Sequence, residues 1–414
     1  MSINKDSQKA PILRFKGFTD DWEQRKLSDV ADIIGGGTPN TNNEEYWNGD
    51  IDWYSPAEIG EQRYVNGSRK KITMLGLQKS SAKILPVGTV LFTSRAGIGN
   101  TAILKKGGAT NQGFQSILPK ENQLDTYFIY SKTDELKRYG EVTGAGSTFI
   151  EVSGKQMEKM PISIPSFEEQ IKIGNFFKQL DDTIALHQRK LDQLKQLKEA
   201  LLQQMFPGKG ETVPKLRFAG FEGDWEERKL SSGLHEYTDR VIVEDDKKYC
   251  QISVRNNFGG ITLRGSKMGN KIGRKRQAKI NLTKYPQTLI FTRQTVEQGG
   301  IGWVDKYCDG AIVTENMPTI SLDTSVFSKH FLTSLFQTRI FYKNAILDNI
   351  DGGSAQIAIH ESKFLSSTLL FPNLDEQEKI GLFFQYLDDT ITLQQRKLDQ
   401  LKNMKQSLLQ NMFI

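Results

Sequence analysis

Apolar side chains recur at alternating spacings of three and four residues along two long segments, near residues 166–207 and 372–414. This heptad pattern is typical of amphipathic helices whose apolar stripe packs against another helix. No proline interrupts either pattern, and a helix of about 39 residues would extend for roughly 58 Å. We therefore predict two long helices with these coiled-coil positions: Ile173, Phe177, Leu180, Ile184, Leu191, Leu194, Leu201, Ile380, Phe384, Leu387, Ile391, Leu398, Leu401 and Leu408.

An apolar stripe of this length needs a partner that covers it. Antiparallel packing of the two helices within one chain would cover both stripes, and this is the arrangement we predict. The alternative is a coiled coil between two copies of the chain. His187 lies in the seam, but its counterpart in the second segment is Gln394. We therefore interpret both as polar packing positions and expect no metal site there.

The two helical segments belong to an internal duplication. Residues 11–27 match residues 214–230 at 12 of 17 positions, and residues 168–206 match residues 375–413 at 27 of 39 positions. The inserts between these repeated segments, about 31–160 and 234–367, differ in sequence. Repeat proteins of the solenoid type have many short copies. Two long copies with different inserts instead predict a pseudo-twofold object with two different globular domains.

The inserts combine strand-like apolar runs (89–93, 288–292 and 311–314) with amphipathic helical segments (125–139 and 328–347). We predict an α+β chain, and its length of 414 residues agrees with several domains. The predicted organisation is a first globular domain at 1–165, a central helix at 166–207, a second globular domain at 208–371 and a C-terminal helix at 372–414.

Charge is distributed unevenly, although the net charge of +6 is modest. Residues 62–120 contain ten Lys and Arg and no Asp or Glu, and residues 247–296 contain twelve and none. Exclusion of acids from corresponding parts of both inserts indicates surfaces that approach phosphates. Arg can read guanine, and Asn or Gln can read adenine. The candidate DNA-binding residues are Arg69, Lys70, Lys71, Arg95, Asn111, Gln112, Arg255, Asn256, Arg264, Lys267, Arg274, Lys275, Arg276, Arg293 and Gln294.

Motifs for catalysis are missing from the sequence. It contains no phosphate-binding P-loop and no Pro-Pro dipeptide, which the usual adenine methyltransferase motif requires. The acidic run at 244–246 lacks the preceding acidic partner of a nuclease site. The adjacent pairs Asp181-Asp182 and Asp388-Asp389 would point about 100° apart on a helix. We therefore predict no catalytic residue and no metal site.

Cys250 and Cys308 do not form a C-x-x-C pair, so the sequence offers neither a zinc nor a redox motif. The polar first ten residues do not look like a secretory signal, and no apolar run is as long as a membrane span. The expectation is a reduced, cytoplasmic protein without membrane association.

The repeated frame resembles that of type I restriction–modification specificity subunits. The resemblance rests on the motif at 13–27 and its copy at 216–230, and on the motif at 169–195 and its copy at 376–402. It implies two target-recognition domains, each reading one half of a bipartite, asymmetric DNA site, with the helices as an antiparallel spacer. It also implies two methyltransferase subunits, which bind S-adenosylmethionine and methylate adenine. Two motor–nuclease subunits, which use ATP and Mg²⁺, would complete the enzyme. This chain would bind no cofactor itself.

Three alternatives remain open from the residues alone. A DNA-binding regulator or architectural protein without enzyme partners would also have basic inserts. A nuclease or methyltransferase in one polypeptide would need the motifs that are missing. A coiled-coil adaptor that binds only proteins leaves the acid-free stretches without an explanation.

Overall fold

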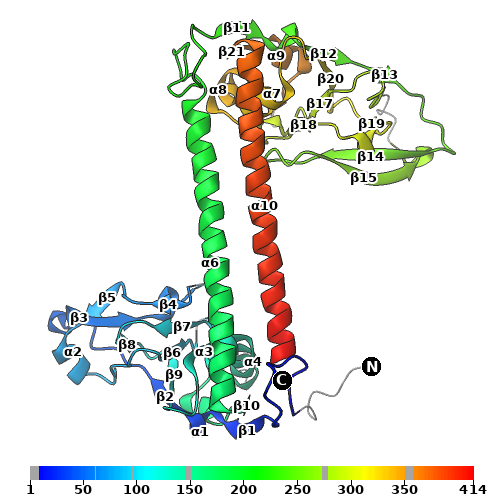
Figure 1. Cartoon of the computed structure of the whole chain (residues 1–414). Helices are drawn as coiled ribbons and strands as arrows, with labels where there is room; N and C mark the ends of the chain where they lie inside the picture. Colours follow the sequence, from blue (N-terminus) through cyan, green and yellow to red (C-terminus); the bar gives the residue numbers. More distant parts are fainter. Residues whose placement is uncertain (1–8, 61, 96, 145–150, 273–277, 350–357) are drawn as a thin grey trace. The chain divides into compact units, whose positions relative to one another are not determined.

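The computed structural model describes residues 9–60, 62–95, 97–144, 151–272, 278–349 and 358–414 (Figure 1). The chain is α+β, with short strands and two long helices. It forms two compact units. Unit 1 comprises the residues up to Gln188 together with Lys397–Ile414, and unit 2 comprises Arg189–Arg396. Within these described ranges, no helix is long and apolar enough to span a membrane.

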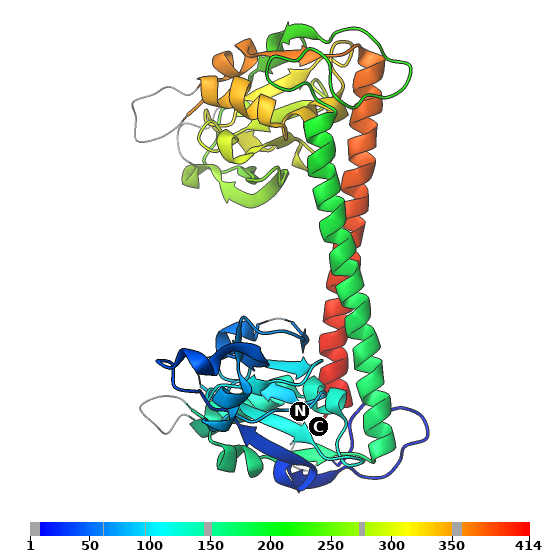
Figure 2. The ribbon, with the colours of Figure 1, turned by 90° about the vertical axis from the view of Figure 1, so that its left-hand side faces the viewer.

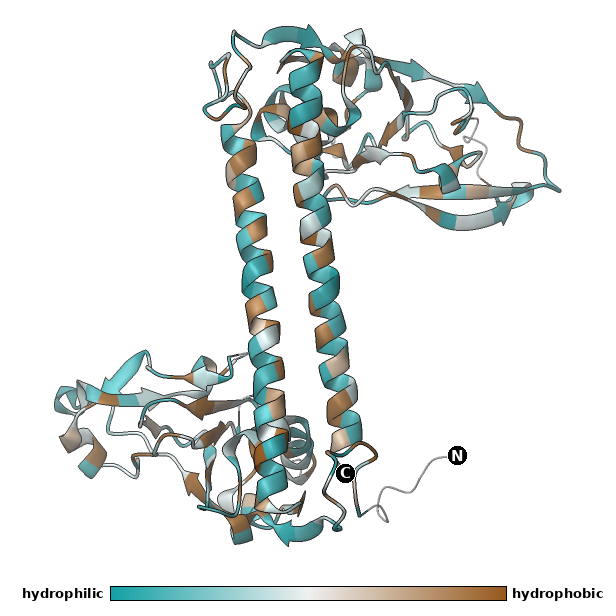
Figure 3. Ribbon diagram, in the orientation of Figure 1, coloured by the Kyte–Doolittle hydropathy of each residue, from teal (hydrophilic) through white to brown (hydrophobic). Residues whose placement is uncertain are grey.

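Both long helices form where the heptad pattern predicts them. Helix α6 extends over Phe167–Gln204 and α10 over Leu374–Met412, each without a break. Apolar positions recur along both of them (Figure 3). A proline precedes each helix, and a glutamine in the first turn donates its amide to that proline's carbonyl: Gln170 to Pro165 at 3.1 Å and Gln377 to Pro372 at 3.0 Å.

Each unit contains a piece of both helices. In unit 1, the Lys405 ammonium lies 2.6 Å from the carboxylate of Asp181, and Lys402 donates to Gln188 at 3.5 Å. The residue number of the α10 partner decreases as the residue number in α6 increases, so the two pieces run antiparallel within this unit. Leu180 of α6 is buried in the same core, because the seam faces inward.

Unit 2 repeats this pairing with the roles of the helices exchanged. Lys198 of α6 pairs with Asp388 of α10, and the rings of Phe206 and Phe384 lie 6.1 Å apart. These two pieces are therefore antiparallel as well. The ion pair joins the same two sequence positions of the repeat as Lys405 and Asp181 do in unit 1.

Unit 1 contains three sheets, and the two larger ones lie to one side of α6 in both views (Figures 1 and 2). Their strand orders are β2-β9-β6-β7-β4, β5-β3-β8 and β1-β10. The strand β6 and its neighbour β7 are buried at every residue, as their β-branched and aromatic composition favours. The strands are β1 (Glu23–Lys26), β2 (Ala31–Gly35), β3 (Trp47–Tyr54), β4 (Tyr64–Val65), β5 (Lys70–Ile72), β6 (Val90–Phe92), β7 (Thr101–Leu104), β8 (Ala109–Thr110), β9 (Gln115–Pro119) and β10 (Pro161–Ile164), and the short helices are α1 (Leu27–Val30), α2 (Met74–Gln78), α3 (Thr126–Ser131), α4 (Thr133–Gly144) and α5 (Gly154–Glu158).

Unit 2 contains the sheets β12-β20-β17-β18, β13-β16-β19-β14-β15 and β11-β21. The two-stranded sheets of the units correspond, because each pairs the strand after the repeated tryptophan with the strand before a long helix. The strands are β11 (Glu226–Lys229), β12 (Leu234–Tyr237), β13 (Asp239–Arg240), β14 (Lys248–Val254), β15 (Ile261–Met268), β16 (Ala278–Lys279), β17 (Thr288–Phe291), β18 (Ile301–Trp303), β19 (Ile312–Val313), β20 (Thr319–Leu322) and β21 (Thr368–Phe371), and the short helices are α7 (Lys329–Leu335), α8 (Arg339–Phe341) and α9 (Glu361–Ser366).

Two of the expected helices are interrupted. Residues 125–139 form α3 and α4, with Lys132 as the C-cap of α3. Residues 328–347 form α7 and α8, followed by a π-helical turn at Tyr342–Ile346. The hydroxyl of Thr338 accepts a hydrogen bond from the Phe341 amide, so this residue starts α8 as an N-cap. Local capping therefore divides segments for which the apolar period alone predicts a continuous helix.

An aromatic cluster closes the core of each unit where a long helix ends. We call Trp22, Phe128, Phe177 and Phe413 cluster 1. The ring of Phe413, which follows α10, lies 5.4 Å from that of Phe128 and 5.7 Å from that of Phe177. The end of the chain therefore completes the core of the domain in which the chain begins.

Cluster 2 consists of Trp225, Phe331, Phe384 and Phe206. The ring of Phe206, which follows α6, lies 5.3 Å from that of Phe331 and 5.9 Å from that of Trp225. The end of α6 thus packs into the core that contains the second repeated motif, whereas the end of α10 packs into the core that contains the first.

A buried ion pair ties each repeated motif to the start of a long helix. Arg14 pairs with Glu169 and Arg217 pairs with Glu376, both at 2.7 Å through two parallel hydrogen bonds. The carboxylates of both pairs are fully buried. Each glutamate raises the pKa of its arginine, mainly through the hydrogen bond. These contacts fix the geometry of each unit around its long helices.

Candidate nucleic-acid interface

The acid-free stretches occupy corresponding parts of the two units. In unit 1 the stretch extends from β4 to the residue after β9, and in unit 2 it extends from just before β14 to just after β17. Each stretch therefore includes the buried central strand of a sheet, β6 or β17, and the exposed loops next to it. Arg95, Arg293 and Gln294 lie in these loops, and the other described candidates lie on edge strands and in other turns.

The first candidate group lies on the edge strand β5 of unit 1. Arg69, Lys70 and Lys71 are all exposed. The Lys71 ammonium lies 3.7 Å from the carboxylate of Asp52, and Lys106 lies 3.0 Å from its other oxygen. Burial would raise the pKa of Asp52, but Lys106, Ser68 and Lys71 outweigh it and hold that pKa below its usual value. The buried carboxylate therefore holds two cations at this edge.

Arg95 lies in the loop after β6 and is exposed. Its Nε atom lies 2.8 Å from a carboxylate oxygen of Glu151. Asn111 accepts a hydrogen bond from the Gly113 amide at 2.8 Å, so its side chain shapes a turn. Gln112 is exposed and its side-chain oxygen accepts from Thr38.

The glycine-rich loop before β3 lies against the Asn111 turn. A Cβ atom at Gly36 would come within 2.0 Å of the Asn111 carbonyl oxygen. Only glycine permits this approach, so the fold brings together two loops that are distant in sequence.

In unit 2, Arg255 and Asn256 lie in the turn of the β14–β15 hairpin and are exposed. Asn256 donates to the side chain of Gln298 at 2.7 Å, and the next two amides donate to the carbonyls of Gln298 and Gly299. The turn is thereby fastened to the loop that follows β17. Phe258, which has a φ of 56° and is 42% exposed, is an aromatic residue at this turn that sequence reasoning missed.

Arg264 and Lys267 are exposed on β15, which is an edge strand of its sheet. Because an edge strand has a neighbouring strand on one side only, its exposed cations are accessible to a nucleic acid. Arg274, Lys275 and Arg276 lie outside the described residues.

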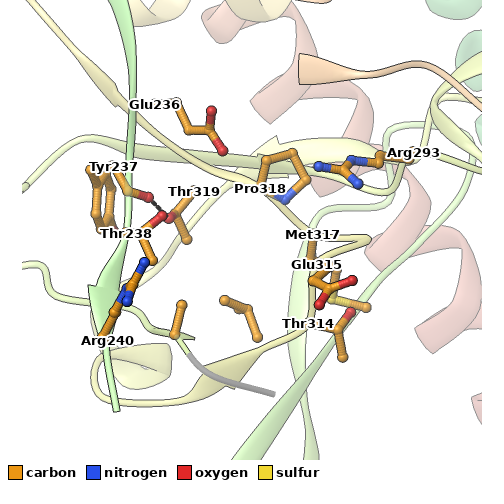
Figure 4. Close-up of a pocket in the computed structure, with 12 residues that line it drawn as sticks. Glu236, Tyr237, Thr238, Arg240, Arg293, Thr314, Glu315, Met317, Pro318 and Thr319 are labelled. Carbon is orange, nitrogen blue, oxygen red and sulfur yellow. Dashed lines mark hydrogen bonds between the residues drawn. The ribbon is translucent and has the colours of Figure 1, made fainter. Parts of the chain in front are cut away.

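Arg293 differs from the other candidates because its side chain is only 19% exposed and pairs with Glu361. It lines a hollow of about 380 Å³, together with Glu236, Arg240 and Met317 (Figure 4). Burial raises the pKa of Glu236, and the nearby Glu361 raises it further. The ion pair with Glu361 therefore neutralises much of the Arg293 charge within unit 2. Its neighbour Gln294 is exposed.

The fourteen predicted seam residues are all buried or half-buried. Gln394 is buried and His187 is half-buried. Asp181 and Asp182 point to different partners, because Asp181 pairs with Lys405 and Asp182 lies 2.7 Å from Arg63. In the parts of the chain described above, no group of three or more His, Cys, Asp or Glu could hold a metal ion.

The family model described as the type I restriction modification DNA specificity domain matches residues 19–196 and 244–403. The MjaIX specificity subunit of a type I restriction enzyme from Methanocaldococcus jannaschii is 37% identical over 45% of this chain and 44% of its own length. The EcoR124I/EcoR124II specificity subunit from Escherichia coli is 29% identical over 41% of this chain and 43% of its own length. Each match thus spans less than half of the curated relative.

Two solved structures share the fold across nearly the whole chain. The S subunit of a type I restriction-modification system from M. genitalium aligns with a TM-score of 0.61 at 12% identity, covering 98% of this chain and 99% of that one. A chain from a type I R-M system, solved for the structural basis of its assembly and conformational transition, aligns with a TM-score of 0.51 at 16% identity, covering 94% and 96%. At these identities the likeness concerns the fold alone.

Proposed function

Because the chain belongs to the family of type I restriction modification DNA specificity domains, we propose that it selects the DNA sequence on which a type I restriction–modification enzyme acts. Each globular domain binds one half of a bipartite, asymmetric site. The chain directs adenine methylation or restriction and performs neither reaction itself.

The observation that carries this proposal is the contrast between the repeated frame and the inserts. The ion pairs of Arg14 and Arg217 and the two aromatic clusters recur in both units. The exposed cations differ in identity and in the strands that hold them. One frame with two different basic surfaces suits a site whose halves differ, whereas a palindrome needs only one surface in a dimer.

The long helices are proposed as the antiparallel spacer between the half-sites, packed against each other as a coiled coil. Two facts support this role. Both helices are unbroken over 38 and 39 residues, and each contributes to the core of both units. The length of a continuous helix is fixed by its number of residues, because each residue adds about 1.5 Å.

The proposed partners are two methyltransferase subunits and two motor–nuclease subunits, in addition to double-stranded DNA. S-adenosylmethionine, ATP and Mg²⁺ are assigned to those subunits. Two identical methyltransferases suit a duplicated frame, because each copy of the frame offers an equivalent docking surface.

The test is co-expression of the chain with its methyltransferase partner, followed by mapping of methylated adenines across the genome. A bipartite motif with a fixed spacer, present only when both proteins are present, is the expected result. Methylation that needs only the partner would refute the proposal. A stand-alone DNA-binding regulator would then be the better description if the pure chain still bound DNA.

A further inference from the structure

The loops after the buried strands β6 and β17 are closed by the same backbone hydrogen bond in the two units. The Thr93 amide donates to Asn100 at 3.0 Å, and the Thr292 amide donates to Gly300 at 3.0 Å. Because Thr93 and Thr292 directly follow β6 and β17, the starts of the two loops can be aligned.

The next residue confirms this alignment. The Ser94 amide donates to Gly113 at 2.8 Å, and its carbonyl accepts from Val152 at 3.1 Å. The Arg293 amide donates to Asn316 and its carbonyl accepts from Ile359, both at 3.0 Å. Both backbones are thus held on two sides by a later loop and by the segment before the short helix α5 or α9.

The following position is therefore equivalent in the two units, and it is occupied by Arg95 in unit 1 and Gln294 in unit 2. Ser94 is buried and Arg293 is half-buried, and both residues that follow them are exposed. The sequences agree with this pairing, because Thr89, Phe92 and Thr93 match Thr288, Phe291 and Thr292 in the same alignment.

Each loop contains glycines that its backbone requires. Gly99 has a φ of 88°, and a Cβ there would lie 2.7 Å from the Lys137 Cα atom. Gly299 has a φ of 75°, and a Cβ at Gly300 would lie 2.4 Å from the Thr295 hydroxyl. Glycine adopts these conformations and permits these approaches because it has no Cβ atom.

We propose that Arg95 and Gln294 are the equivalent base-reading positions of the two domains, with Arg95 selecting guanine in one half-site and Gln294 selecting adenine in the other. This assignment rests on the proposed function. Arg forms two hydrogen bonds with guanine O6 and N7, and Gln forms two with adenine N6 and N7.

Base reading fits these side chains better than phosphate binding does. Glu151, which is 36% exposed at its side chain, lies beside the Arg95 guanidinium and would repel a phosphate there. Guanine presents neutral acceptors, and the guanidinium has further N–H donors on its two terminal nitrogens. Gln294 has no charge with which to neutralise a phosphate.

The test exchanges the two residues in the chain co-expressed with its methyltransferase partner. Arg95→Gln is expected to change or relax one base position in one half-site, and Gln294→Arg one base position in the other. The discrimination lost at that position should be about 5- to 150-fold. The other half-site and the spacer length should stay as they are. Arg138→Gln and Thr324→Arg, which alter charge at exposed positions outside the two loops, should leave the motif unchanged.

Arg95→Lys separates reading from charge, because lysine retains the charge but not the fork geometry. It should relax the same base position as Arg95→Gln. The assignment is overturned if both exchanged variants methylate the parental motif with unchanged selectivity. It is also overturned if Arg95→Gln weakens binding to all sequences equally and lowers the salt slope by about one, which is the signature of a phosphate contact. A wild-type complex without any bipartite motif would instead refute the proposed function.

Discussion

Phe413 is expected to stabilise unit 1, although it is the penultimate residue of the chain. Its ring lies within 5.4–6.2 Å of the rings of Phe128, Phe177 and Trp22, which come from α3, α6 and the first repeated motif. Truncation to alanine removes these contacts and leaves a cavity in cluster 1. The fully buried Phe206 makes the corresponding contacts in cluster 2.

The size of the effect follows from burial. Replacing a fully buried phenylalanine by alanine costs about 3–5 kcal/mol, which is the expectation for Phe206→Ala. Phe413 is half-buried, so Phe413→Ala should cost about 2–3 kcal/mol of unfolding free energy. For a unit of roughly 200 residues this corresponds to a decrease in Tm of about 4–12 °C.

The measurement is urea unfolding of the full chain, monitored by tryptophan fluorescence. Trp225 and Trp303 are the tryptophans of unit 2, so a Trp225→Phe/Trp303→Phe background follows unit 1 alone, through Trp22, Trp47 and Trp53. Leu186→Ala, at a residue of α6 that is 61% exposed, is the matched control and should change the unfolding free energy by less than about 0.5 kcal/mol. If Phe413→Ala costs no more than this control, the end of α10 does not close the core of unit 1.

Three further predictions concern charge and helix length. Glu376→Gln should cost about 3 kcal/mol in urea unfolding, because it leaves a partly buried arginine without its carboxylate, whereas the exposed Glu226→Gln should be nearly neutral. An equal loss in both would contradict the role of burial. The folded-state pKa of Asp52 lies below its unfolded value, so its contribution to stability is present above about pH 4 and is lost as pH falls through the folded value. Asp52→Asn should therefore flatten the acid limb of a Tm-versus-pH curve, and an unchanged limb would argue against it. Four residues inserted after both Gln188 and Arg396, where the units divide, lengthen each helix by about 6 Å and should widen the spacer of the methylated motif by one to two base pairs. An unchanged spacer would refute the spacer role of the helices.

Local sequence determined the long helices and the repeated frame. The heptad positions from Ile173 to Leu408 are buried or half-buried because an apolar period of 3.5 residues specifies both a helix and its inward face. The strand expected at 288–292 forms as β17 (Thr288–Phe291), since β-branched and aromatic residues favour strands. These features depend on neighbours that are close in the chain.

Only the tertiary structure decided which cations form ion pairs within a unit. Arg293 is suited to DNA by residue type, yet it pairs with Glu361, which lies 68 residues away. The aligned runs 89–93 and 288–292 already relate Arg95 to Gln294, and the structure adds the backbone bonds to the segments that precede α5 and α9. Phe413 enters the core of the domain where the chain begins. Contacts of this kind depend on chain closure over long distances, and a single sequence contains no local signal for them.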